Sequence, residues 1–316
     1  MTEGLIVKAL SGFYYVEAFE DGKAAGNARA GCAPTVYQCR ARGLFKKEGA
    51  TRVTPLVGDR VRFDVTDEKD AEGYVTEILP RRNAFIRPPV ANVEVFLVTV
   101  AAKDPDPNPE LTDRFLVSAE AADAEAVVVV NKDDLSPAAA RKMAQIYRGV
   151  YPVAVVSAQT REGTDALWEM IKGRTVAFAG ASGVGKTSLL ACWAEDLAAS
   201  METGEVSRKT GRGKHTTRHV EIFRCADGTL LFDTPGFSAF EPAEAANLAA
   251  GRMDMLFPEF LPYLGGCRFD NCSHTHEPGC AVRAALEAGK IRQTRYGSYV
   301  KVLEEVEKWQ NYHHQS

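Results

Sequence analysis

The chain has 316 residues, of which 45% are hydrophobic and 25% charged, and its formal net charge is −4 at neutral pH. This length allows two or three domains with cores of their own, and the composition is that of a globular protein rather than of a disordered or fibrous one. The net negative charge does not indicate a nucleic-acid-binding protein, so any RNA-binding surface has to be local.

The N-terminus and the cysteines indicate the compartment. Residues 1–4, Met-Thr-Glu-Gly, lack the basic start and apolar run of a signal peptide, and no stretch approaches the ~18 apolar residues of a membrane helix. The chain has seven cysteines, an odd number, and three of them lie near one histidine. This pattern favours a metal site in a reducing compartment over a disulfide framework. We therefore expect a cytoplasmic protein with no membrane partner.

Residues 1–82 are expected to form a small β-barrel domain. Short runs of β-branched and aromatic residues, separated by Gly, Pro and Asp, occur at 7–16, 36–42, 60–65 and 73–79. Strands at this spacing favour an oligonucleotide-binding (OB) type of barrel. The domain carries basic side chains and aromatic rings: Arg40, Arg42, Lys46, Lys47, Arg60 and Arg62, with Phe13, Tyr14, Tyr15, Tyr37 and Phe45. They indicate an RNA-binding surface with stacking platforms, and the alternative is a solvated charged face over an aromatic core.

Residues 83–242 are expected to form a second domain, in which strands and helices alternate. Strands are predicted at 93–100, 126–130, 152–156 and 175–179, helices at 111–122, 137–149 and 163–172, and a loop at the proline-rich segment 104–109. This alternation predicts a mostly parallel sheet with helices on both faces. Ligands of such sheets bind at the carboxyl ends of the strands, so motifs that directly follow strands are expected to converge on one site.

The first of these motifs is a phosphate-binding loop. Residues 180–187 read Gly-Ala-Ser-Gly-Val-Gly-Lys-Thr, between a predicted strand and a predicted helix. The glycines let successive backbone N–H groups point at an anion, and the helix N-terminus adds its partial positive charge. Lys186 is expected to reach the β- and γ-phosphates, and the Thr187 hydroxyl to ligate Mg²⁺. The predicted contacts of this loop are Gly180, Ser182, Gly183, Val184, Gly185, Lys186, Thr187 and Ser188.

A second motif, Asn131-Lys132-Asp133-Asp134, follows the strand at 126–130. A carboxylate there can accept hydrogen bonds from guanine N1–H and the exocyclic amine, whereas adenine offers no matching donors and leaves a costly unpaired carboxylate. Asp134 is therefore predicted to select guanine, with Asn131 and Lys132 bracing the loop and flanking the base. Ser157 and Ala158, directly after the strand at 152–156, fit the loop whose backbone contacts the guanine carbonyl in GTPases.

Two further segments are predicted to act as switches. Asp233 follows the strand at 229–232, so it is expected to hold Mg²⁺ through water, while the Gly236 N–H senses the γ-phosphate. Residues 211–217 read Gly-Arg-Gly-Lys-His-Thr-Thr, and a threonine here, Thr216 or Thr217, can complete the Mg²⁺ shell when the γ-phosphate is present.

The water-positioning residue is harder to assign. Ras-like GTPases carry a water-orienting Gln directly after the glycine of the second switch, and here that residue is Phe237. His215, in the first switch, is the candidate for positioning water, and the alternatives are RNA binding or packing. The segment 207–219 contains basic residues and no acid, so it is either a solvated loop or a loop that contacts RNA phosphates and is ordered by them.

The order of these motifs differs from that in Ras-like GTPases. The guanine motif and Ser157-Ala158 precede the phosphate loop, and the two switch segments follow it. The motifs are those of a Ras-like GTPase, but their order along the chain is circularly shifted. The sequence therefore predicts a circularly permuted P-loop GTPase domain, in which the second switch leads directly into the C-terminal domain.

Residues 243–316 are expected to form a helical, zinc-binding C-terminal domain. Three thiols and one imidazole lie within a short stretch, at Cys267, Cys272, His274 and Cys280. This set suits tetrahedral Zn²⁺, and the absence of an open position indicates a structural site. His276 is a competing ligand, and His274 is preferred. Apolar residues from Tyr296 to Val306 have helical spacing that indicates packing.

The combination resembles the RsgA/YjeQ family of ribosome small-subunit-dependent GTPases over essentially the whole chain. The matching motifs are 10–15 (Leu-Ser-Gly-Phe-Tyr-Tyr), 55–59 (Pro-Leu-Val-Gly-Asp), 86–89 (Ile-Arg-Pro-Pro), 113–116 (Asp-Arg-Phe-Leu), 211–219, 277–280 (Glu-Pro-Gly-Cys) and Arg295-Tyr296. The resemblance implies a GTPase that binds the 30S subunit and its 16S rRNA late in assembly, is stimulated by it, and helps to mature the decoding region. Release of assembly factors and a link to guanine alarmones are also implied.

The departures from the family pattern are small. Thr187 stands where the family usually has Ser, and Ala191 where Asn is common. Residues 20–34 look like a longer Ala/Gly-rich barrel loop, which leaves their RNA contacts open.

Three functional readings follow from the sequence. The first is a GTP hydrolase gated by the 30S subunit, most simply a monomer, with one structural Zn²⁺ and with Mg²⁺ accompanying GTP. The second is an RNA-binding assembly chaperone in which GTP acts mainly as a release timer. The third is a P-loop ATPase or kinase with an unrelated zinc module, which Asp134 disfavours.

Overall fold

The computed structural model describes residues 1–19, 35–41, 45–46, 52–85, 88–200, 220–225, 227–233 and 253–314. The chain folds into two compact units. The first comprises Met1–Val95, Thr164–Phe178 and Thr187–Phe237, and the second Phe96–Gly163, Ala179–Lys186 and Ser238–Ser316. The domain boundaries expected after residues 82 and 242 stay predictions. Among the helices in the described ranges, none is long and apolar enough to cross a membrane.

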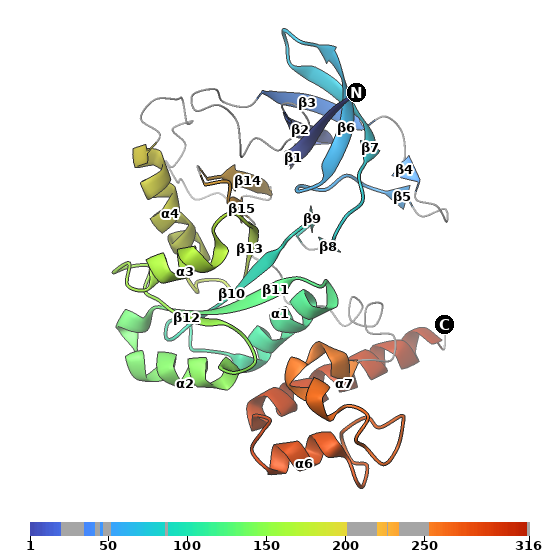
Figure 1. Cartoon of the computed structure of the whole chain (residues 1–316), viewed down its shortest axis with the longest axis vertical. Coiled ribbons are helices and arrows are strands. Elements are labelled where there is room, and N and C mark those ends of the chain that lie inside the picture. Colours follow the sequence, from blue (N-terminus) through green and yellow to red (C-terminus); the bar gives the residue numbers. More distant parts are fainter. Residues whose placement is uncertain are drawn as a thin grey trace. The chain divides into compact units, whose positions relative to one another are not determined.

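A closed five-stranded barrel forms the N-terminal part of the first unit (Figure 1). Its strands are β1 (Thr2–Leu10), β2 (Phe13–Ala18), β3 (Val36–Ala41), β6 (Arg60–Asp67) and β7 (Glu72–Ile78). The strand order is β1-β2-β3-β7-β6, and the additional pairing of β1 with β6 closes the barrel. Fully buried side chains fill its interior: Ile6, Val16, Cys39, Val61, Phe63 and Val75. The predicted N-terminal barrel is therefore confirmed.

The run at 7–16, expected as one strand, is a hairpin. Ser11 and Gly12 connect β1 to β2, and both have positive φ angles, 51° and 82°. Two successive positive φ angles are typical of the tight turns that match the twist of antiparallel strands. The apolar run continues across this turn, which is why the sequence pattern hid it. Two shorter strand pairs accompany the barrel: β4 (Phe45–Lys46) with β5 (Arg52–Val53), and β8 (Ala84–Phe85) with β9 (Val90–Ala91).

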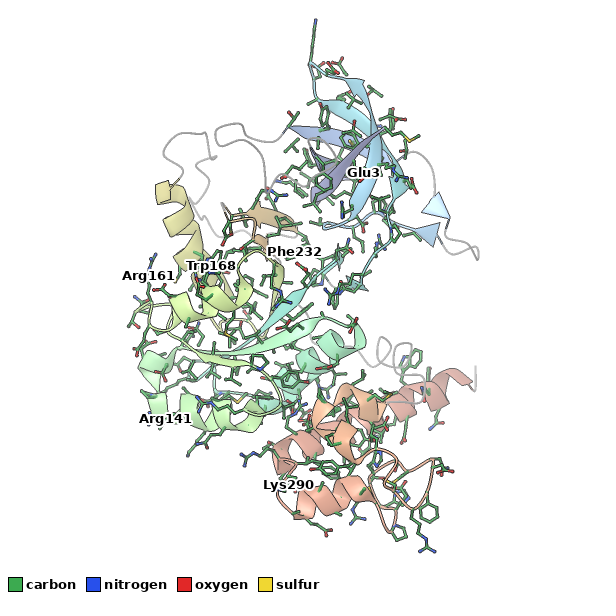
Figure 2. All side chains as sticks on the ribbon, viewed as in Figure 1. Glu3, Arg141, Arg161, Trp168, Phe232 and Lys290 are labelled. Carbon is green, nitrogen blue, oxygen red and sulfur yellow. The ribbon has the colours of Figure 1, made fainter. Side chains whose placement is uncertain are left out.

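The rest of the first unit is a sheet with two helices. β13 (Thr175–Ala179) and β15 (Leu230–Asp233) are parallel, and β14 (Glu221–Arg224) pairs antiparallel with β15. On its other side β14 also pairs with the barrel strand β1, at Lys8 and Glu221. The helices are α3 (Thr164–Ile171) and α4 (Lys186–Ser200). They meet through Trp168, labelled in Figure 2, and Trp193, whose ring centroids lie 5.2 Å apart.

The second unit begins with the strand order β12-β11-β10. The strands are β10 (Val95–Ala101), β11 (Glu125–Asn131) and β12 (Val153–Val155), and β11 and β12 are parallel, in agreement with the predicted sheet. They alternate with α1 (Pro109–Ala121), the short 3₁₀ turn η2 (Asp133–Leu135) and α2 (Pro137–Tyr147).

The predicted loop at 104–109 ends one residue earlier than expected. Pro109 begins α1, and the Asn108 side chain caps the helix by accepting a hydrogen bond from the Leu111 N–H at 3.1 Å. Proline suits this position because the first N–H of a helix has no partner within the helix.

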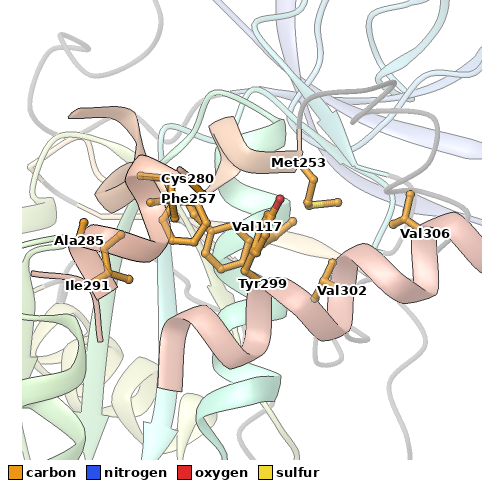
Figure 3. Packing of buried hydrophobic residues seen from close by; sticks show 11 residues of the cluster. Val117, Met253, Phe257, Cys280, Ala285, Ile291, Tyr299, Val302 and Val306 are labelled. Carbon is orange, nitrogen blue, oxygen red and sulfur yellow. The ribbon is translucent and has the colours of Figure 1, made fainter. Parts of the chain in front are cut away.

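The C-terminal part of the second unit is helical, with its own hydrophobic cluster (Figure 3). It contains the 3₁₀ turns η3 (Met253–Leu256) and η4 (Pro258–Tyr263) and the helices α6 (Ala281–Glu287) and α7 (Gln293–His314). Tyr299 of α7 meets Phe257 edge-on, with ring centroids 5.3 Å apart. Val117 of α1 joins the same cluster. The predicted apolar stripe of α7 therefore packs inward.

Candidate functional site

The phosphate loop between β13 and α4 has a backbone that only glycine allows at two positions. Gly180 and Gly185 have φ angles of 138° and 96°. A Cβ atom on Gly180 would lie 2.2 Å from the Thr99 carbonyl oxygen, and one on Gly185 would lie 2.2 Å from Asn131 Nδ2. Any side chain at either position would collide with a neighbour as well as strain the backbone. Glycine at these positions therefore lets the loop approach the Thr99 carbonyl and the Asn131 amide closely.

The Lys186 side chain is folded back over this loop. Its Nζ donates hydrogen bonds of 2.7 Å to the carbonyl oxygens of Gly180 and Ala181. Burial lowers the pKa of Lys186 to about 8, because a buried ammonium group loses its hydration. Phosphate oxygens are stronger acceptors than carbonyls and carry charge. The position and environment of Lys186 thus fit an anionic ligand of the loop.

Asn131 joins the predicted guanine motif to two other loops. The residue is 1% exposed at the end of β11. Its Nδ2 donates to the Val184 carbonyl oxygen at 2.9 Å, and its Oδ1 accepts from the Ala158 N–H at 3.0 Å. One buried amide therefore holds the guanine motif, the phosphate loop and the Ser157-Ala158 loop together, and both of its polar ends are satisfied.

The exposed side chain of Asp134 is oriented by Ser157. Ser157 is 1% exposed, and its Oγ donates to Asp134 Oδ1 at 2.5 Å. The same Oγ accepts from the Thr160 N–H at 3.1 Å, which fixes the hydroxyl rotor. The sequence assigned only a backbone contact to Ser157. The hydrogen bond from its side chain to Asp134 was not predicted, and the only sequence signal for it was the serine itself.

Lys132, the second residue of the guanine motif, adopts a left-handed conformation with φ of 62°. This conformation is uncommon for a residue with a side chain. Its Nζ donates to the Asp104 carbonyl oxygen, so the loop before α1 also supports the guanine motif.

The residues predicted to hold magnesium are described only in part. Thr187 and Ser188 lie exposed in the first turn of α4. Asp233 is the last residue of β15, and its backbone is directly opposite Glu221 of β14. His215, Thr216, Thr217 and Gly236 lie outside the described residues.

The four predicted zinc ligands come together in the second unit. The side-chain ligand atoms of Cys267, Cys272, His274 and Cys280 all lie within 4.8 Å of one another. His274 Nδ1 is 3.5 Å from Cys267 Sγ and 3.4 Å from Cys280 Sγ, and the two sulfurs are 3.9 Å apart. Three sulfurs and one imidazole nitrogen at these separations fit one tetrahedral ion of the zinc type.

The surroundings of the cluster suit thiolates and orient the imidazole. The Ala281 and Arg283 N–H groups donate to Cys267 Sγ and Cys280 Sγ, each at 3.4 Å. His274 Nε2 lies 3.5 Å from Asp254 Oδ2, an arrangement that directs Nδ1 toward the sulfurs. The competing ligand His276 is exposed, and its Nδ1 lies 2.8 Å from Thr275 Oγ1.

Glu277 braces the loop that carries His274, and the sequence analysis quoted it only as part of the motif at 277–280, without a role. Its carboxylate accepts from the N–H groups of Ser273 at 2.7 Å and of Thr275 and His276 at 3.2 Å each. Burial acts to raise the pKa of Glu277, but these hydrogen bonds outweigh it and hold the pKa well below its usual range. An acid three residues before the last cysteine was the available signal.

Comparisons with known proteins agree with this geometry. The model of the family described as RsgA GTPase matches residues 78–243, and that of the family described as RsgA N-terminal domain matches residues 3–75. The chain is 43% identical over 313 residues to the small ribosomal subunit biogenesis GTPase RsgA of Agathobacter rectalis, covering 98% of this chain and 99% of that protein. It is 46% identical over 311 residues to the protein of the same name from Geobacillus thermodenitrificans, covering 97% and 98%.

Two solved structures share the fold. YjeQ from Thermotoga maritima superposes with a TM-score of 0.73 at 32% identity, covering 96% of this chain and 98% of that one. YloQ, described as a circularly permuted GTPase, gives a TM-score of 0.71 at 34% identity, covering 98% and 96%.

Proposed function

This chain belongs to the RsgA GTPase family and is a GTP hydrolase, and we propose that it binds the 30S ribosomal subunit and hydrolyses GTP during late maturation of that subunit. The relatives carry small-subunit biogenesis in their names. The observation that carries the guanine-nucleotide part of the proposal is the buried amide of Asn131, which joins the guanine motif to the phosphate loop. A P-loop ATPase or kinase has no guanine motif, so it does not require a residue that joins such a motif to the phosphate loop.

Guanine is selected by Asp134. Its carboxylate, oriented by the Ser157 hydroxyl, accepts from guanine N1–H and the exocyclic amine, while the backbone of the Ser157-Ala158 loop contacts the guanine carbonyl. Lys132 flanks the base. Adenine leaves the carboxylate without donors, and discrimination against a ligand that lacks the matching groups is strong.

The phosphates are held by the loop at 180–188. Backbone N–H groups of the loop and the Lys186 ammonium bind the β- and γ-phosphates, and binding moves Lys186 from its own carbonyls to the nucleotide. Thr187 and Asp233, here called the magnesium pair, hold Mg²⁺, which supplies charge neutralisation at the phosphates when bound. Thr216, Thr217 and Gly236 respond to the γ-phosphate as switch residues, and His215 positions the attacking water.

One structural Zn²⁺ is bound by Cys267, Cys272, His274 and Cys280. The compact cluster of donor atoms and the N–H groups that face the sulfurs support this assignment. With four protein ligands the ion has no open position, so its role is to fix the segment around η3, η4 and α6 in place.

The ribosomal role has further consequences. The barrel and the basic segment 207–219 contact 16S rRNA, the subunit stimulates hydrolysis, and guanine alarmones compete with GTP because they share the base and the phosphates. A protein that works on ribosomal subunits acts in the cytoplasm, and we propose that it acts as a monomer.

The test is GTP hydrolysis by the purified chain with and without vacant 30S subunits, at two salt concentrations. Strong stimulation that fades with salt is expected, because phosphate contacts are lost as salt rises. Unchanged turnover in the presence of subunits would contradict the subunit-gated function. A Lys186→Ala variant distinguishes this function from that of an RNA-binding assembly chaperone. If the chain is such a chaperone, maturation of the subunit proceeds without GTP hydrolysis and only release of the protein fails.

A further inference from the structure

A cavity lies between the cysteine cluster and helix α7 in the second unit. Its volume is about 530 Å³, which is within the range of ~300–1,000 Å³ that is usual for ligand pockets. Three of the four proposed zinc ligands are among its lining residues. A single metal ion would fill only a small part of this space, since even one water molecule takes up ~30 Å³ in the liquid. The cavity therefore extends well beyond the proposed zinc site.

One part of the lining is apolar. Met253 and Val306, which line the cavity, also belong to the hydrophobic cluster of this part of the chain and are 4% exposed (Figure 3). Phe269, another lining residue, is 42% exposed. The apolar lining thus runs from the hydrophobic cluster to the surface. The guanidinium carbon of Arg268 lies 5.7 Å from the centre of the Phe269 ring, so this ring is placed to attract a cation.

The charged side chains of the lining are acidic. Asp254, Asp270 and Glu307 contribute carboxylates, and none of the lining residues, all of which lie in the described ranges, is Lys or Arg. Asp254 Oδ2 lies 3.5 Å from His274 Nε2, whereas Asp270 and Glu307 are exposed and form no salt bridge among the described residues. These carboxylates disfavour nucleic acid as the ligand, because its phosphates would meet charges of their own sign.

We propose that this cavity binds a basic peptide segment of a partner protein. The head group of an Arg or Lys of the segment meets Glu307 and Asp270, its stem lies against Phe269, and a neighbouring apolar side chain reaches toward Met253 and Val306. Arg and Lys suit such a place because they carry a charged head on an apolar stem, and a guanidinium also stacks on an aromatic ring. A free polyamine has the charge but no side chain for the apolar inner end.

The source of such a segment follows from its charge. Basic arms are common in proteins that bind nucleic acid, and a chain that binds the 30S subunit meets proteins of this kind. Only this last step rests on the proposed function, since the lining itself sets the chemistry of the ligand.

The test is the fluorescence anisotropy of a fluorescein-labelled peptide of alternating Arg, Gly and Leu, titrated with the full-length protein at physiological salt. Glu307→Lys is expected to weaken binding about five- to tenfold, because it replaces an attraction by a repulsion. Phe269→Ala is expected to weaken it about threefold through loss of the ring. Glu287→Lys is the matched control: it makes the same change of charge at an exposed residue of α6 outside the lining, and is expected to change the affinity less than about twofold.

A second set of probes separates the proposed ligand from other cations and from RNA. Replacing each Leu of the peptide by Gly is expected to weaken binding. Spermidine that displaces the labelled peptide at equal concentration would show that a free polyamine suffices, and would overturn the proposal. Single-stranded RNA whose affinity falls in Phe269→Ala would assign the cavity to nucleic acid and overturn it too.

The comparison of the variants decides the remaining outcomes. Equal losses in Glu307→Lys and Glu287→Lys would show that the peptide responds only to net charge, which overturns the proposal, and so does an affinity that Phe269→Ala leaves unchanged. The titration contains neither nucleotide nor subunits. Absence of peptide binding therefore contradicts this inference alone, whereas absence of GTP binding by the unsubstituted protein would contradict the proposed function.

Discussion

Arg295 and Asp113, on helices α7 and α1, form a fully buried ion pair with 2.7 Å between Nη1 and Oδ1. The Arg295 Nε and Nη2 groups also donate to the two oxygens of Glu259, at 2.6 Å and 3.0 Å. The guanidinium carbon lies 4.8 Å from the centre of the Phe257 ring. One side chain thus fastens the C-terminal segment that carries the cysteine cluster to the first helix of the nucleotide-binding part.

Arg295→Met is expected to destabilise the second unit by about 3–5 kcal/mol, because it leaves the carboxylates of Asp113 and Glu259 buried without the positive charge that pairs with them. The measurement is urea unfolding of the full-length protein followed by far-ultraviolet circular dichroism. Lys301→Gln removes a charge from the same helix, where Lys301 pairs with Glu110 of α1 in a largely exposed salt bridge, and should cost no more than about 1 kcal/mol. Equal losses in the two variants would contradict the importance assigned to Arg295.

Gly185→Ala is expected to abolish measurable nucleotide binding while the protein stays folded. The new Cβ atom would lie 2.2 Å from Asn131 Nδ2, so the amide that joins three loops has to move. Gly149→Ala is the matched control, since Gly149 has a similar φ of 88° but nothing within 4 Å of the added atom. Both variants pay backbone strain of about 1–3 kcal/mol. A nucleotide affinity as high in Gly185→Ala as in Gly149→Ala would show that the collision with Asn131 does not disturb the site.

The pKa of Lys186 predicts proton uptake on nucleotide binding. The pKa is lowered to about 8 by burial in the free protein, and a phosphate in contact with the ammonium raises it again. Binding therefore takes up protons between the two pKa values, and affinity is full below pH 8 and falls as the pH rises above it. Calorimetry of GTP binding at pH 8, in two buffers of different ionisation enthalpy, should report uptake of about half a proton. Equal heats in the two buffers would show that Lys186 is already fully protonated.

The fold was largely predictable because its signals are local. Hydrophobic runs and helical spacing lie within one element, and β11 and α2 appear within two residues of the expected positions. Two elements were predicted wrongly because a local pattern does not mark where one element ends and the next begins. An apolar run that continues through Ser11 and Gly12 conceals a hairpin, and a proline-rich loop conceals a helix that starts at its last proline.

The candidate site was predictable as far as its motifs have fixed spacing. The phosphate loop, the guanine motif and the cysteine cluster are each contiguous or nearly so. The contacts that hold these parts together are not local in the sequence. Arg295 and Asp113 are 182 positions apart in the chain, and the hydroxyl of Ser157 meets Asp134 only because two strands pair in parallel. Such contacts depend on tertiary packing, which no local pattern contains.

Asp134→Asn is expected to weaken GTP binding by two orders of magnitude or more and to favour xanthosine triphosphate, whose ring has a carbonyl where guanine has its amine. Ser157→Ala is expected to weaken GTP binding about tenfold, the effect of losing one hydrogen bond to a charged group, without a change of base preference. Competition binding against labelled GTP measures both. A guanine preference unchanged in Asp134→Asn would remove the selector from this position.

The two neighbouring histidines offer a paired test of the metal site. His274 is buried with Nδ1 3.4 Å from Cys280 Sγ, whereas His276 is exposed and contacts Thr275. His274→Ala is expected to lose the zinc ion proposed for this cluster and to unfold the C-terminal segment, because metal binding and folding are coupled in such sites. His276→Ala is expected to keep one zinc per chain and near-normal stability. Atomic absorption of the purified proteins gives the metal content, and thermal unfolding with and without a chelator gives the stability.

Since Tyr296 and Tyr299 of α7 donate hydrogen bonds to the carbonyls of His274 and Ser273, the chelated protein should also lose protection of α7 in hydrogen exchange. Full protection of α7 after zinc removal would show that Arg295 and the hydrophobic cluster hold the helix without the metal site.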